Sequence, residues 1–147
     1  MRRSDMRRDD HGSALMLMPA GLLIVLVLAS IAVDMSLVHL RKRQAFELAA
    51  AAANDAAAAG ADQGRLRSGS YVLDPDVTRS VVEEVVAASE LASELAGPPF
   101  VTVTDDGVRV ELAVQADYIF AGVVPGAPDG TVITASATAT ALAGPAP

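Results

Sequence analysis

An uninterrupted apolar stretch near the start of the chain constrains its fold more than any other feature. Residues 13–33 contain no charged, amide or aromatic side chain. As an α-helix rising about 1.5 Å per residue, the stretch is about 32 Å long, which matches a hydrocarbon layer about 30 Å thick. A buried core helix of this kind needs apolar partners on every side, and the chain has only 3 Phe, 2 Tyr and no Trp. The stretch therefore predicts a single membrane-spanning helix.

Pro19 interrupts the hydrogen-bonding capacity of this stretch. A proline inside a helix lacks the N–H group and clashes with the carbonyl group four residues earlier, so we expect a bend there. A helix that began only at Pro19 would be about 22 Å long up to Val33, too short to span without help from its flanks. We therefore expect Pro19 to lie inside the helix.

The charges divide the chain into a basic start and an acidic remainder. Residues 1–43 carry seven basic and four acidic side chains, whereas residues 44–147 carry four basic and fourteen acidic ones. Because the acidic part has no clustered basic face, we expect no nucleic-acid partner. The short basic tail, residues 1–12, favours the cytoplasm. The predicted topology is a single-pass membrane protein with a cytoplasmic N-terminus and an extracytoplasmic C-terminal domain.

Residues 34–60 predict a continuation of the same helix. The alanine tract that ends this segment has the highest intrinsic helix propensity, and Gly60 is a natural helix stop. Two interpretations of the tract stay open: a plain spacer, or a surface whose small side chains let another helix approach closely. In the second, Ala52 and Ala56 are candidate packing positions for a partner helix.

Asp34 stands where the apolar stretch meets this extension. An acidic side chain at such a position is usually solvated, which predicts an exposed carboxylate at the outer membrane interface. The alternative is an ion pair with a basic residue on a neighbouring helix.

Residues 61–147 predict a small exported α/β domain. Asp74 and Pro75 form an N-cap and first helical position, and a valine-rich helix follows until the run Gly97-Pro98-Pro99. Beyond it, apolar residues alternate with polar ones in three segments separated by turn residues, which predicts a three-stranded antiparallel meander. The predicted fold class is α+β, with one helix packed on the sheet. The expected core residues are Val81, Val85, Val110, Leu112, Val114 and Ile133.

Nothing in the sequence has the pattern of a catalytic or cofactor site. His11 and His39 lie on opposite sides of the apolar stretch and cannot meet, and there is no cysteine. Gly122 and Gly126 are not followed by the Lys-Ser/Thr pair of a phosphate-binding loop. We therefore expect a protein that is not an enzyme and has no catalytic residues, cofactor, metal or small-molecule substrate.

The first sixty residues resemble the TadE/TadG-like pilus-assembly proteins, which are pseudopilin-related proteins of the tight-adherence (Flp) pilus system. The features that carry the resemblance occur in a fixed order: Gly12-Ser13, the apolar run with Pro19, Ala32-Val33-Asp34, the basic cluster Arg41-Lys42-Arg43, and the alanine tract of residues 51–57. The resemblance implies a pilin-like architecture and a bacterial, membrane-anchored protein that assists assembly or export of a Flp-type pilus at the cell surface.

One position departs from the processed members of that group. They carry Glu at the fifth position after the glycine at which the prepilin peptidase cuts, and here that position is Leu17. The departure favours the uncleaved TadG-like type. Gly12 and Ser13 remain the candidate processing site.

A second class of function is compatible with the same residues. Ser30 and Ala32 are small residues at the two positions that a signal peptidase reads, so cleavage after Ala32 would release a secreted or surface binding domain. Against this, the apolar stretch is longer than a typical signal-peptide core of about 7–15 residues.

Overall fold

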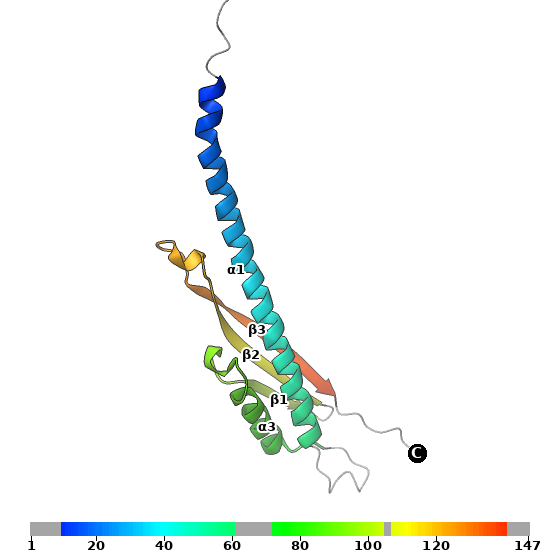
Figure 1. The fold of residues 1–147 in the computed structure, drawn as a ribbon. Coiled ribbons are helices and arrows are strands. Elements are labelled where there is room, and N and C mark those ends of the chain that lie inside the picture. Colours follow the sequence, from blue (N-terminus) through cyan, green and yellow to red (C-terminus); the bar gives the residue numbers. More distant parts are fainter. Residues whose placement is uncertain (1–9, 61–71, 105–106, 141–147) are drawn as a thin grey trace, which may run out of the picture.

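The computed structural model describes residues 10–60, 72–104 and 107–140. In chain order they form helix α1, helix α3, the short 3₁₀ helix η1, strands β1 and β2, the short 3₁₀ helix η2 and strand β3. Figure 1 shows that the first half of α1 protrudes from the rest of the molecule, while the second half lies across the sheet. The architecture is α+β, as predicted.

Helix α1 extends over Asp10–Ala59, a total of 50 residues. At about 1.5 Å per residue it is about 75 Å long. The predicted continuation of the apolar helix through the alanine tract is confirmed, and the helix does not begin at Pro19, which lies inside it. Most of the predicted cytoplasmic tail, residues 1–9, lies outside the described residues.

The surroundings of α1 change at Asp34. From Leu17 to Val33 the side chains are exposed, except for the half-buried Ser30. From Asp34 onward one face of the helix is buried against the rest of the chain, and the exposed fraction of Ala45 falls to 0%. The other buried alanines of this face are Ala49, Ala52, Ala53, Ala56 and Ala57. The two halves of the helix therefore lie in different environments. The apolar half is not covered by the domain, and the alanine-faced half is packed inside it.

Helix α3 extends over Pro75–Ala87 and begins as the sequence predicts. The Asp74 carboxylate accepts hydrogen bonds from the backbone N–H groups of Asp76 and Val77, at 2.9 and 3.3 Å, and so caps the first turn. Its buried residues are Thr78, Val82 and Val86. The Thr78 hydroxyl is satisfied because it donates to the Asp74 carbonyl oxygen at 2.7 Å.

Strands β1 (Phe100–Thr104), β2 (Gly107–Asp117) and β3 (Gly130–Thr140) form the predicted antiparallel meander in the order β1-β2-β3. Val110 in the central strand pairs with Val101 of β1 and Ala137 of β3. Alternate residues of β2 point to one face and are buried there, because side chains of a strand alternate between its two faces. The turn residues 105–106 lie outside the described residues.

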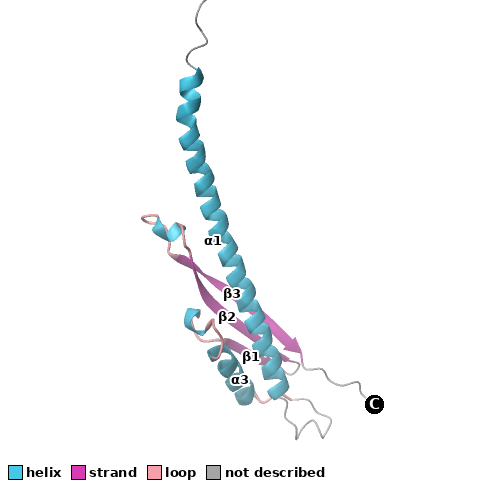
Figure 2. Cartoon of the chain, in the orientation of Figure 1, coloured by secondary structure: helices cyan, strands magenta, loops and turns pink. Residues whose placement is uncertain are grey.

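Helix α1 covers more of the sheet than α3 does. It packs on β2 and β3, whereas α3 packs along α1 and beside β1 (Figure 2). Both helices contribute to one apolar cluster, in which Ala52 of α1 and Val82 of α3 lie with Val110 of β2. The predicted domain of residues 61–147 implies a boundary at residue 60. In the structure, α1 on one side of residue 60 and α3 and the sheet on the other share one apolar core. Among the described residues, the alanine face of α1 supplies six of the 17 buried hydrophobic residues, so the second half of α1 is part of the packed core.

Gly60 ends α1 where the two helices meet. A Cβ atom at this position would collide with the Thr78 hydroxyl and lie 2.9 Å from the Ala56 carbonyl oxygen. The Gly60 carbonyl oxygen also accepts a hydrogen bond from the backbone N–H of Asp74, at 2.8 Å. Glycine is therefore required here by the close approach of α1 and α3.

The predicted core is confirmed at its centre and shifted at its edges. Val110, Leu112 and Val114 are fully buried. Val81, Val85 and Ile133 are only partly buried and pack against the core from its edges. On α3 the buried face is rotated by about one residue from the expected valine stripe, since the sheet and α1 enclose the helix from two sides.

We expect Ala52→Leu to destabilise the domain. Three extra carbon atoms would have to fit between α1 and β2 at a position with no exposed surface. Overpacking of this kind costs about 1–3 kcal/mol in the free energy of unfolding. Urea denaturation of the full chain in detergent micelles, followed by circular dichroism, measures the change.

Ala51→Leu is the matched control, because Ala51 is the neighbouring residue of the same helix and is exposed. It should change the free energy of unfolding by less than about 0.5 kcal/mol. Equal stabilities for the two variants would show that the alanine face is not buried against the sheet.

Candidate functional site: the anchor–domain junction

The Asp34 carboxylate joins the anchor half of α1 to the loop between β2 and β3. Its Oδ1 atom accepts hydrogen bonds from the backbone N–H groups of Ile119 and Phe120, at 2.9 and 3.1 Å. Its Oδ2 atom accepts from the N–H of Ala121 at 2.9 Å. Only 4% of the residue is exposed. Three charge-assisted bonds therefore hold the loop at the point where the apolar half of the helix ends.

The loop has its own internal supports, which keep its backbone in the shape that Asp34 binds. The Tyr118 N–H donates to the Asp129 carbonyl oxygen at 2.8 Å and closes the base of the loop. The short helix η2, Ala121–Val123, begins at the last of the three residues whose N–H groups donate to Asp34. Gly126 has a φ angle of 87°, in the left-handed region that favours glycine.

The surroundings of Asp34 favour its charged form. Burial by itself raises the pKa of the carboxyl group, but hydrogen bonds from Ala121, Phe120 and Ile119 stabilise the carboxylate and hold the pKa of Asp34 below its ordinary value. Asp34 lies one residue beyond the predicted spanning segment, residues 13–33. A negative charge at this position therefore stabilises the junction.

The prediction of an exposed carboxylate at Asp34 is wrong, and the ion pair with a basic residue on a neighbouring helix stays a prediction. The residue is buried, so it is not an exposed interfacial carboxylate, and its partners are backbone N–H groups of its own chain. The sequence did contain a signal for the burial. Ala45 and Ala52 follow Asp34 by about three and five helical turns, so all three share one face. Nothing local identified Ile119–Ala121 as the partner, since that loop lies 85 to 87 residues away.

The other predicted site residues are distributed along α1. Ala52 and Ala56 are fully buried in the core of their own domain, so the prediction that they contact a partner helix is corrected. The small side chains do permit close approach, but to β2, β3 and α3 of the same chain. Gly12 and Ser13 lie near the start of α1. Processing at Gly12 stays a prediction.

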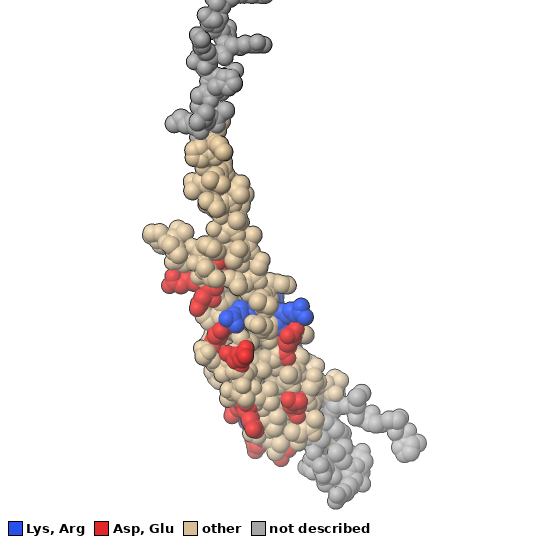
Figure 3. Space-filling model, viewed as in Figure 1, with Lys and Arg blue, Asp and Glu red and all other residues tan. Residues whose placement is uncertain are grey.

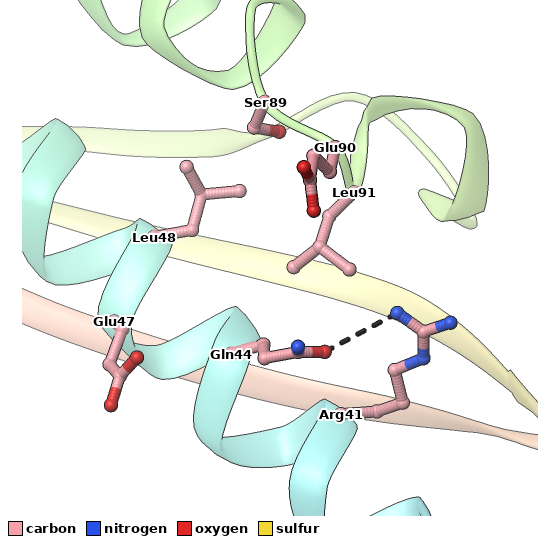
Figure 4. Close-up of a pocket in the computed structure, with 7 residues that line it drawn as sticks. All are labelled: Arg41, Gln44, Glu47, Leu48, Ser89, Glu90 and Leu91. Carbon is pink, nitrogen blue, oxygen red and sulfur yellow. Dashed lines mark hydrogen bonds between the residues drawn. The ribbon is translucent and has the colours of Figure 1, made fainter.

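A groove of about 240 Å³ lies between α1 and the segment that follows α3. Figure 4 shows Arg41 and Gln44 on α1, with Leu48 and Leu91 between the two segments. The Arg41 guanidinium donates to the side-chain amide oxygen Oε1 of Gln44 at 3.3 Å and pairs with the Glu94 carboxylate at 2.9 Å. The ion pair between Arg41 and Glu94 therefore connects α1 to η1 (Ala92–Glu94) beside this groove.

The titratable residues do not form a metal centre in the part of the chain that the structure describes. No group of three or more His, Cys, Asp and Glu side chains is suitably placed there. His39 is exposed on α1 beside Lys42, Arg43 and Phe46, where these residues and β3 line an open depression.

By length and composition, one helix among the described residues is a candidate membrane span, and it is α1. Comparisons of the chain with family models, with curated proteins and with solved structures find no match.

We expect Asp34→Ala to lower the thermal unfolding midpoint more than Asp34→Asn does. The asparagine side chain keeps one acceptor oxygen, whereas alanine leaves all three N–H groups without their partner. Calorimetry of the full chain in detergent micelles measures the order. Asp55→Asn, an equal charge change at an exposed position of α1, should leave the midpoint unchanged. A junction without these hydrogen bonds would give three indistinguishable variants.

The stabilisation by Asp34 should depend on pH. Because the folded-state pKa is depressed, the contribution is present above the unfolded-state pKa of about 3.9 and is lost as the pH falls through the folded-state pKa. The difference in unfolding midpoint between the parent and Asp34→Asn should therefore be constant near neutral pH and shrink below about pH 4. A difference that grows on acidification would contradict the depressed pKa.

Proposed function

We propose that this chain is a non-catalytic, single-pass membrane protein that assists assembly or export of a Tad/Flp-type pilus, in the manner of a minor pseudopilin. Its N-terminus lies in the cytoplasm and its α/β domain lies outside the membrane. The observation that carries the proposal is the change of environment along α1. Large apolar side chains at 43–78% exposure, from Leu17 to Val33, give way at Asp34 to a helix face buried in the domain.

In water, this exposed apolar surface would be unfavourable. Exposed apolar residues such as Leu22, Ile24 and Leu26 cover the protruding half of α1 on all sides, and a bilayer is the solvent that removes such a surface from water. Apart from the bond that Pro19 cannot donate, a helix pairs its interior backbone N–H and C=O groups within itself, as lipid requires. The surface therefore supports anchoring in a membrane.

The pilus proposal has two further supports. The order of features in residues 12–60 resembles the TadE/TadG-like proteins. A long helix with a free apolar half and a half that covers an antiparallel sheet is also what a pilin-like architecture requires. Since Ala52 and Ala56 are buried, contacts with pilus or platform subunits fall to the protruding half, where helices pack by van der Waals contact in lipid.

The intact mass of the protein in the membrane fraction tests the anchor. We expect the uncut chain of 15.0 kDa, because the apolar stretch is longer than a signal-peptide core and Leu17 replaces the acidic processing signal. A chain that starts at Ser13 would establish processing at Gly12. A product that starts at Val33 in the medium would contradict the anchor and support a secreted binding domain.

Photo-crosslinking tests the partners. A photoreactive residue in place of Leu26, in the protruding half, should crosslink to membrane proteins of the pilus machinery. The same residue in place of the exposed Thr102 on β1 is the control and should give none. Absence of crosslinks at Leu26, together with normal pili after deletion of the gene, would refute the pilus function and leave the membrane anchor intact.

A further inference from the structure

The loop that Asp34 holds exposes a second apolar surface next to the anchor. Ile119, Phe120, Val123 and Val124, here called the loop tip, have exposed fractions of 56%, 45%, 79% and 57%. The four residues lie within six positions of one another, on and around η2. A cluster of large apolar side chains in water at the end of a loop is unfavourable unless something covers it.

In the loop between β2 and β3, the charged residues lie at the base and the apolar residues lie at the tip. Residues 118–128 contain no Asp, Glu, Lys or Arg, and the acidic residues Asp117 and Asp129 stand at the base. Figure 3 shows the uncharged tip projecting beside α1, with acidic side chains on the side away from the anchor. Such a loop can enter an apolar layer by a short distance without burying a charge.

Asp34 sets the level of the loop along the anchor. Its carboxylate binds Ile119, Phe120 and Ala121 one residue after the spanning segment ends at Val33. The loop tip consequently lies beside α1, near the end of the predicted spanning segment, and Figure 1 shows η2 next to the middle of the helix. Tyr118, at the base of the loop, is of a residue type that is enriched at membrane–water interfaces.

We propose that the loop tip inserts into the lipid–water interface at the point where α1 leaves the bilayer, so that the domain rests on the membrane at two places. The inference depends on the membrane anchoring proposed above. Lipid is the occupant because the tip adjoins an anchor surface that is itself apolar and uncovered, and because burial of apolar side chains about 5–10 Å deep needs no charged partner. The insertion should therefore be insensitive to salt.

Site-directed spin labelling of the full chain in phosphatidylcholine vesicles tests the inference. The chain has no native cysteine, so a single introduced cysteine takes the label at one position. At Val123→Cys, we expect collisions with oxygen to exceed collisions with a water-soluble nickel complex, and this ratio to stay the same when the salt concentration is raised. Val123 is the most exposed of the four tip residues, so its replacement should leave the fold unchanged.

Two further positions serve as controls. Val132→Cys lies on an exposed site of β3, 53% exposed, and should show the reverse ratio because that surface faces water. Val27→Cys lies in the middle of the anchor and should be accessible to oxygen alone. A Val123 label that behaves like Val132, while Val27 is in lipid, would overturn the interfacial loop only and favour a protein partner for the tip. A Val27 label in water would overturn the anchor itself.

Discussion

The close approach of α1 to the sheet is the constraint on which the rest of the domain depends. Methyl side chains at Ala45, Ala49, Ala52 and Ala56 let the helix backbone lie directly over β2 and β3, where valine and leucine side chains fill the space. A helix with larger residues on this face would be held further away, and the small sheet would lose its cover. Because a sheet with one apolar face must bury that face against another element, the alanine face of α1 supplies the cover that β2 and β3 need.

The same helix also connects the domain to its own protruding apolar half. Asp34 lies at the boundary between the two halves and connects the β2–β3 loop to it by three hydrogen bonds. Gly60 closes the other end against α3, and Arg41 pairs with Glu94 between them. With attachments along the full length of the extension, a displacement of the anchor should be transmitted to the domain as a rigid-body motion. Such coupling suits the assembly role proposed above.

Local patterns in the sequence predicted the helices and strands. They did not predict the contacts between elements that are far apart in the chain. Helical propensity predicted α1 to Ala59, the Asp74-Pro75 pair predicted the start of α3, and alternation predicted Val110, Leu112 and Val114 in the core. The alanine tract was ambiguous because a small side chain suits a spacer, a partner helix or a sheet equally well. Asp34 was misassigned because its partners are backbone groups of a loop far along the chain. Thr78 was missed because its hydroxyl is satisfied locally, which lets a polar residue enter the core.

Native-state hydrogen exchange of the full chain in lipid nanodiscs tests the central claim most directly, namely that the alanine half of α1 is part of the domain core. Amides at 45–57 of α1 should open with the same free energy as amides at 108–114 of β2, and the two sets should respond identically to added denaturant, because both belong to one cooperative unit. Exchange at 45–57 that occurs at lower free energy, while β2 stays protected, would contradict the account. It would show that α1 is a separate stalk beside a domain that folds without it.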